Sequence, residues 1–121
     1  MDIIQTAQDL IRFRSETGNA EEINKVMDYV KNLFSATDAV VDVFEEVEGA
    51  PVIFIRNIET QDFDVLVLGH IDVVAAKEEM FEPKIYDGKM YGRGSLDMKS
   101  FAAVALNSMQ YVLEQKLPLK F

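Results

Sequence analysis

The stretch that decides the fold reads Phe63-Asp64-Val65-Leu66-Val67-Leu68-Gly69-His70-Ile71-Asp72-Val73. Its first six residues are apolar nearly throughout, which predicts a strand that is covered on both faces. Two shorter runs precede it, at residues 40–44 and 51–55, and both are rich in β-branched and aromatic residues that favour strands. We therefore expect a sheet whose most buried strand is formed by residues 63–68.

Apolar residues at helical spacing flank these runs and predict three helices. The first covers about residues 2–14, the second ends at about Ser35, and the third runs from Met98 to about Lys116. Asn19 precedes the second helix and Glu22 follows three residues later, which is typical of a capping box. Helices before and after a buried strand indicate an α/β architecture, a layered sheet with flanking helices.

Two further segments have recognisable turn or strand patterns. Asp87-Gly88 predicts a tight turn between residues 84–86 and 89–91, which would form a small hairpin. The last residues, Leu117 to Phe121, alternate like a strand that is about to begin. Because domains seldom finish on a strand without a partner, we expect a longer domain of which this chain is the first part. A frayed tail that contains a proline is the alternative interpretation.

The composition is that of an ordinary globular chain, with 49% hydrophobic and 27% charged residues. Twelve Lys and Arg against twenty-one Asp and Glu give a net charge of −9, which disfavours binding to nucleic acid or to anionic membranes. No cysteine is present, so disulfides, thiolate zinc sites and cysteine nucleophiles are excluded. The N-terminus lacks a signal-peptide pattern, and we expect a cytoplasmic location.

The candidate functional residues are centred on His70, the single histidine of the chain, which follows the carboxyl end of the predicted buried strand. Open α/β sheets place their ligand sites at such strand ends. Residues two apart in an extended chain share a side, so Asp72 can contact one imidazole nitrogen while the other faces a metal. Asp97 precedes the third helix, and a carboxylate can bridge two divalent ions about 3.5–4 Å apart. Gly92 and Gly94 allow close backbone approach beneath such a site.

Each of these signals has an ordinary structural explanation when it is taken alone. A histidine beside an aspartate is commonly a structural pair, and Gly92-Arg93-Gly94 is a common turn. An aspartate before a helix, such as Asp97, is commonly an N-cap. The order of the motifs is more specific than any one of them: Gly69-His70-Ile71-Asp72-Val73-Val74, then Phe81-Glu82-Pro83, then Asp87-Gly88-Lys89-Met90-Tyr91-Gly92-Arg93-Gly94-Ser95-Leu96-Asp97-Met98-Lys99.

In this order the motifs closely resemble the metallopeptidase and deacylase family of acetylornithine deacetylase, succinyl-diaminopimelate desuccinylase, aminoacylase and the glutamate carboxypeptidases. The resemblance implies the N-terminal portion of a di-zinc exopeptidase-type catalytic domain. It further implies that His70 binds one zinc ion, that Asp97 bridges two, and that Asp72 is the catalytic-site carboxylate that orients His70. The peptide bond between Asp97 and Met98 is commonly cis in this family.

The chain also departs from the family pattern. It has no tryptophan, Ala75 follows Val74 where a proline is common, and Phe101 stands where a small residue is common. The family also uses a Glu-Glu pair, another acidic ligand and a distant histidine, all of which would lie after Phe121. We therefore expect that residues 1–121 form a partial catalytic domain, without the rest of that domain or the dimerisation domain. Such a chain would be inactive alone and would bind zinc weakly or not at all.

Two functions of different classes follow. The first is the N-terminal part of a zinc-dependent hydrolase of amide bonds, acting on N-acyl amino acids or peptides, with cobalt as a second candidate ion. The second is a non-catalytic α/β module for binding or assembly, which could form a homo-oligomer through an exposed sheet edge. A different two-zinc aminopeptidase family is a weaker third interpretation.

Overall fold

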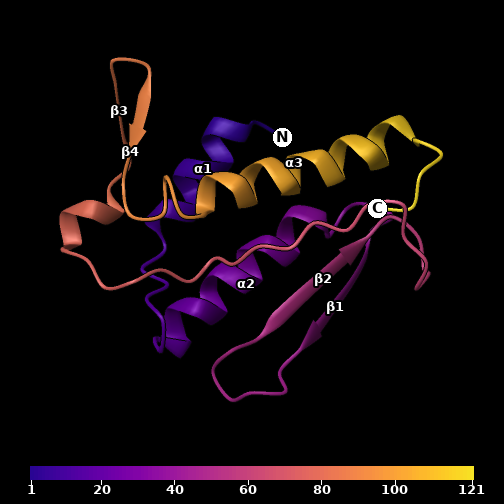
Figure 1. Ribbon diagram of the computed structural model, residues 1–121, viewed down its shortest axis with the longest axis horizontal. Helices are drawn as coiled ribbons and strands as arrows, with labels where there is room; N and C mark the ends of the chain where they lie inside the picture. The colour runs from indigo at the N-terminus through magenta and orange to yellow at the C-terminus, as the bar shows by residue number, and fades with distance from the viewer.

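The computed structural model describes residues 1–121, and the fold is mixed α/β, as the sequence predicts (Figure 1). Three α-helices and one short 3-10 helix alternate with two antiparallel hairpins. In chain order the elements are α1 (Ile3–Arg12), α2 (Ala20–Phe34), β1 (Val40–Phe44), β2 (Val52–Arg56), η1 (Glu78–Phe81), β3 (Lys84–Tyr86), β4 (Lys89–Tyr91) and α3 (Lys99–Gln115). No helix is both long and apolar enough to cross a membrane.

The first two helices begin at side chains that cap their free backbone N–H groups. Asp2 accepts a hydrogen bond from the Gln5 backbone N–H at 2.8 Å, and Asn19 accepts one from the Glu22 backbone N–H at 3.3 Å. The reciprocal half of the predicted capping box is absent. The Glu22 carboxylate accepts from the backbone N–H of Arg14 at 3.1 Å instead, which joins the start of α2 to the segment before it.

Both hairpins have regular antiparallel pairing. In the first, Val40 of β1 lies opposite Arg56 of β2. The second has Asp87 and Gly88 at its turn with φ of 50° and 68°. Positive φ at both central residues is the geometry of the turn that joins two strands most tightly, and it confirms the predicted Asp-Gly hairpin.

The three α-helices share one hydrophobic core, and apolar residues of the β1–β2 hairpin pack against it. Figure 1 shows α1 and α3 side by side, with α2 and the hairpin below them. The buried positions of each helix recur mainly at a spacing of three to four residues, which is the pattern of an amphipathic helix with one apolar face. The core residues are Ala7, Leu10, Val26, Val30, Phe34, Ala102, Ala103, Leu106 and Met109.

The predicted central strand at residues 63–68 is not formed. Leu66 and Leu68 are 70% and 85% exposed, so the expectation of a strand covered on both faces is wrong for this structure. Asp64 and Val65 donate backbone hydrogen bonds to the carbonyl of Lys120, but residues 66–70 have no backbone partner. An apolar run shows that both faces suit burial, but a strand also needs a neighbouring strand to satisfy its N–H and C=O groups.

The last residues do not form a strand either, contrary to the prediction from their alternation. They still lie beside the segment that leads into residues 63–68. The carbonyl of Phe121 accepts from the Asn57 backbone N–H at 3.1 Å, and that of Lys120 accepts from Asp64 at 2.9 Å. In place of one continuous sheet, the structure therefore has a two-stranded hairpin and an extended segment beside it.

Candidate metal centre

His70 lies between two carboxylates that are distant from each other in the sequence. Its Nδ1 is 3.0 Å from the backbone oxygen of Asp72 and 3.3 Å from the Oδ1 of the same residue. Its Nε2 is 3.3 Å from Oδ1 of Asp97. The structure therefore brings together the three side chains that the sequence singled out as His70, Asp72 and Asp97.

These side chains line a pocket of about 270 Å³ together with the backbone that leads into α3. The site is open to solvent, since the side chain of His70 is 48% exposed and that of Asp97 is 81% exposed. Its other lining residues are Thr17, Val73, Val74, Gly92, Arg93, Gly94, Ser95 and Leu96.

Asp97 is positioned by the tight loop that ends at the start of α3. The Asp97–Met98 peptide bond is cis, as the family resemblance implied. Gly94 has a φ of 91°, and its carbonyl accepts the backbone N–H of Lys99 at 2.8 Å. The loop therefore folds back on the first residue of α3 and leaves the Asp97 carboxylate facing His70.

The two glycines of this loop pack closely against neighbouring side chains. A Cβ atom on Gly94 would lie 2.8 Å from Cδ of Lys99, and one on Gly92 would lie 2.7 Å from Cγ2 of Ile11. A third glycine, Gly69, lies against Phe101, because a Cβ there would be 3.3 Å from two atoms of the phenyl ring. This contact shows how the unexpected phenylalanine is accommodated next to His70.

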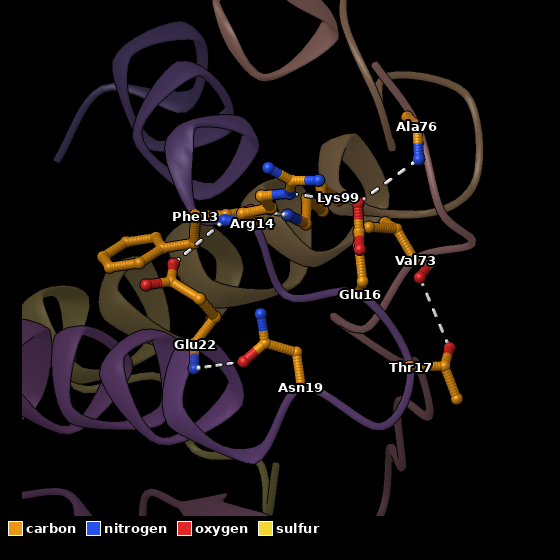
Figure 2. Close-up of polar contacts among 9 residues, drawn as sticks. All are labelled: Phe13, Arg14, Glu16, Thr17, Asn19, Glu22, Val73, Ala76 and Lys99. Atoms are coloured by element: carbon orange, nitrogen blue, oxygen red, sulfur yellow. Dashed lines mark hydrogen bonds and ion pairs between the residues drawn. The ribbon is translucent and has the colours of Figure 1, made fainter. Parts of the chain in front are cut away.

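Two polar residues that the sequence did not single out support the site. Thr17 donates its hydroxyl to Oδ2 of Asp72 at 2.6 Å. Lys99 is fully buried, and its Nζ donates to the carbonyl of Phe13 at 2.7 Å (Figure 2). Burial lowers the pKa of Lys99 to about 8, while the carboxylates of Glu22 and Asp72 act in the opposite direction.

The burial of Lys99 could have been predicted from the pattern of α3, but nothing in the sequence indicated the contact of Thr17 with Asp72. Lys99 precedes the buried Ala102 and Ala103 by three and four residues, so it lies on the buried face of the helix. Thr17 lies in a turn, where a threonine usually stabilises local backbone, and its partner is 55 residues away.

The donor set is chemically suited to zinc, which binds imidazole nitrogen and carboxylate oxygen. Nε2 of His70 and the carboxylate of Asp97 provide two such donors close together, while Asp72 lies at the opposite ring nitrogen, Nδ1. Catalytic zinc usually takes three protein ligands, and no group of three or more His, Cys, Asp or Glu side chains is arranged to hold an ion here. The residues present therefore fit part of a zinc site.

Comparison with known proteins identifies the relatives of this chain. Succinyl-diaminopimelate desuccinylase of Wolbachia pipientis wMel is 25% identical over 96% of the chain, and 30% of the length of that protein is covered. The N-formyl-4-amino-5-aminomethyl-2-methylpyrimidine deformylase of Bacillus subtilis (strain 168) is 24% identical over 98% of the chain and 30% of its own length. The chain thus spans 30% of the length of these curated relatives.

Among solved structures, human carnosine dipeptidase 1 shares the fold. Its crystal structure superimposes with a TM-score of 0.79 and 20% sequence identity, covering 98% of this chain and 30% of that one. Residues 66–121, which include His70, Asp72 and Asp97, match the family described as Peptidase family M20/M25/M40. The desuccinylase and the deformylase, which align with nearly the whole chain, fit the same family that residues 66–121 match, Peptidase family M20/M25/M40.

Proposed function

We propose that this chain is the N-terminal part of a zinc-dependent hydrolase that cleaves amide bonds of N-acyl amino acids or peptides. The observation that carries the proposal is the convergence of His70 with Asp72 and Asp97 in one open pocket. The names of the relatives, a desuccinylase, a deformylase and a dipeptidase, support acylated amino compounds or peptides as the substrate class.

In this proposal each of the three residues has a separate role. His70 would hold a zinc ion through Nε2, and the carboxylate of Asp97 would hold zinc beside it. Asp72 faces Nδ1 of His70 and holds the ring in the orientation that ligation needs. Zinc, or cobalt in its place, supplies Lewis-acid polarisation of a carbonyl oxygen.

We further propose that residues 1–121 alone have no hydrolase activity. Two ligands are fewer than the three that catalytic zinc usually takes, and no carboxylate of the chain is matched to the role of general base. The relatives are more than three times as long as the part that this chain covers, which supports further ligands outside residues 1–121.

Calorimetric titration of zinc into the purified chain, with an amide-hydrolysis assay on N-succinyl and N-acetyl amino acids, tests these proposals. We expect weak zinc binding that is lost in His70→Ala and in Asp97→Asn, with no turnover in any sample. Turnover that disappears on His70→Ala would contradict the inactivity of the chain. Zinc binding that both variants retain unchanged would contradict the assignment of the site.

A non-catalytic role in assembly is the second candidate. The observation that favours it is the exposed apolar segment 66–70, whose backbone has no partner and which can accept another strand. A second copy of this chain could pair there as a homo-oligomer. Sedimentation over a range of protein concentrations tests this candidate, and a chain that stays monomeric throughout would exclude self-assembly. The cytoplasmic location stays a prediction.

A further inference from the structure

We propose that Thr17 is a positioning residue of the candidate metal centre. Its hydroxyl holds one oxygen of the Asp72 carboxylate, so that the other oxygen faces Nδ1 of His70. The inference deepens the proposed function and rests on it, because it assigns Thr17 a role in orienting the histidine that would bind zinc.

The contact between Thr17 and Asp72 is short and directional. The Thr17 Oγ1 lies 2.6 Å from Asp72 Oδ2 and 3.3 Å from the carbonyl oxygen of Val73. A hydroxyl has one hydrogen to donate, and an ionised carboxylate is the stronger acceptor of the two. The remaining oxygen, Oδ1, is the one that lies 3.3 Å from Nδ1 of His70.

Backbone pairing fixes Thr17 relative to the residues that it supports. The Thr17 N–H donates to the carbonyl of Val73 at 2.9 Å, and the Val73 N–H donates to the carbonyl of Ser15 at 2.9 Å. The hydroxyl of Ser15, which is fully buried, donates to the carbonyl of Ile71 at 2.7 Å. Asp72 therefore lies between Ile71 and Val73, whose backbone groups are hydrogen-bonded to residues 15–17.

The segment Phe13–Thr17 is itself fastened to three other parts of the molecule (Figure 2). Lys99 of α3 donates to the Phe13 carbonyl, and Glu22 of α2 accepts from the Arg14 backbone N–H. The Glu16 carboxylate accepts from the backbone N–H of Ala76 at 3.3 Å. Because these anchors come from different elements, the Thr17 hydroxyl is presented at a defined place rather than on a free loop.

The consequence is that the proton of the neutral His70 imidazole prefers one of the two ring nitrogens. Nδ1 of His70 faces two acceptors from Asp72, and Nε2 faces one carboxylate oxygen of Asp97. A neutral imidazole has one N–H, so the two sides compete for it. Thr17 favours the Nδ1–H tautomer by holding the Asp72 carboxylate in place, and this tautomer leaves the Nε2 lone pair free for a metal ion.

Nuclear magnetic resonance of the imidazole nitrogens tests the inference, since His70 is the single histidine of the chain. Spectra of the 121-residue chain without metal, at about pH 8.5 where ordinary imidazoles are neutral, report the ratio of the two tautomers. We expect Thr17→Val to lower the ratio of Nδ1–H to Nε2–H by about fivefold, the scale of the net contribution of one hydrogen bond. Thr17→Ser, which keeps the hydroxyl, should retain the parent ratio, and Asp72→Ala should lower it at least as much as Thr17→Val.

An unchanged ratio in Thr17→Val, with a lowered ratio in Asp72→Ala, would overturn the inference, because Asp72 would then hold its place without Thr17. An unchanged ratio in both would also overturn it, since the backbone carbonyl of Asp72 would then suffice. Backbone amide spectra check folding, and Thr17→Ala replaces the valine variant if that variant does not fold. The readout needs neither zinc nor turnover, so a failure of zinc binding would count against the proposed function alone.

Discussion

Lys99 is the residue whose burial has the clearest energetic consequence. A lysine without solvent exposure is uncommon, and here one carbonyl, that of Phe13, accepts its ammonium group. Burial disfavours the charged form and lowers the pKa to about 8, against about 10.5 for an ordinary lysine. The residue therefore joins the start of α3 to the end of α1 at an electrostatic cost.

This cost predicts that the free energy of unfolding rises with pH above 8. Between about pH 8 and pH 10 the unfolded chain keeps the lysine proton that the folded chain releases, so alkali favours the folded state. Urea unfolding followed by circular dichroism should show a rise on the order of 1–3 kcal/mol over this range, and Lys99→Met should abolish it. Tyr29, whose pKa burial raises to about 12, opposes this trend only above pH 10. Parallel pH profiles for parent and variant would contradict the prediction.

At the scale of elements, the loop before α3 determines where Asp97 lies. The loop needs a residue with φ of 91° at Gly94, and the same position must leave room for the buried Lys99 side chain. The hairpin turn at Gly88 has a similar φ of 68°, but a Cβ added there would meet no atom within 4 Å. A side chain at Gly88 would therefore carry only the cost of the backbone conformation, whereas one at Gly94 would also overlap Lys99.

Alanine at these two positions should therefore have unequal effects. Both changes place a side chain in the left-handed region, at about 1–2 kcal/mol each. We expect Gly94→Ala to lower the free energy of unfolding by about 1–3 kcal/mol more than Gly88→Ala does, because its Cβ would overlap the stem of Lys99. Urea unfolding of both variants measures the difference. Equal losses in Gly94→Ala and Gly88→Ala would show that Lys99 gives way without cost.

At the scale of the whole molecule, an apolar face lies open beside the three-helix core. A pocket of about 500 Å³ is lined mostly by hydrophobic residues of the β1–β2 hairpin, the segment 63–71 and α3. Leu66 and Leu68, both largely exposed, belong to this face. Exposed apolar surface of this kind favours contact with another chain segment, and it is the face that the proposed assembly would use.

Lysine at the exposed leucines should therefore reduce self-association without loss of stability. We expect Leu66→Lys and Leu68→Lys to change the free energy of unfolding by less than about 0.5 kcal/mol, as surface substitutions usually do. Sedimentation at moderate salt, which screens the net charge of −9, should show less association than in the parent. Ile4→Lys, an equal charge change at a residue of α1 that is 55% exposed, should associate like the parent. If all three variants associate as strongly as the parent, this face is not the surface through which two copies of the chain meet.

The fold was largely predictable wherever a local pattern reports it. The spacing of apolar residues located α1, α2 and α3, and the Asp-Gly pair located the β3–β4 turn, because helices and tight turns depend on near neighbours. The motif order named the three side chains that meet at the candidate site, His70, Asp72 and Asp97, and their role as metal site residues stays a prediction. The supporting contacts of Thr17 and Lys99 were not predictable, because their partners are 55 and 86 residues away.

The sequence by itself determined the helices, the approximate positions of β1 and β2, the Asp-Gly hairpin and the family resemblance, since each rests on residues that are close together along the chain. Tertiary structure alone decided that residues 63–68 have no strand partner, and that segment Phe13–Thr17 supports Asp72. The physical reason is the range of the interactions. Periodicity describes which face of an element is apolar, whereas pairing, burial and the convergence of polar groups depend on which distant segments meet.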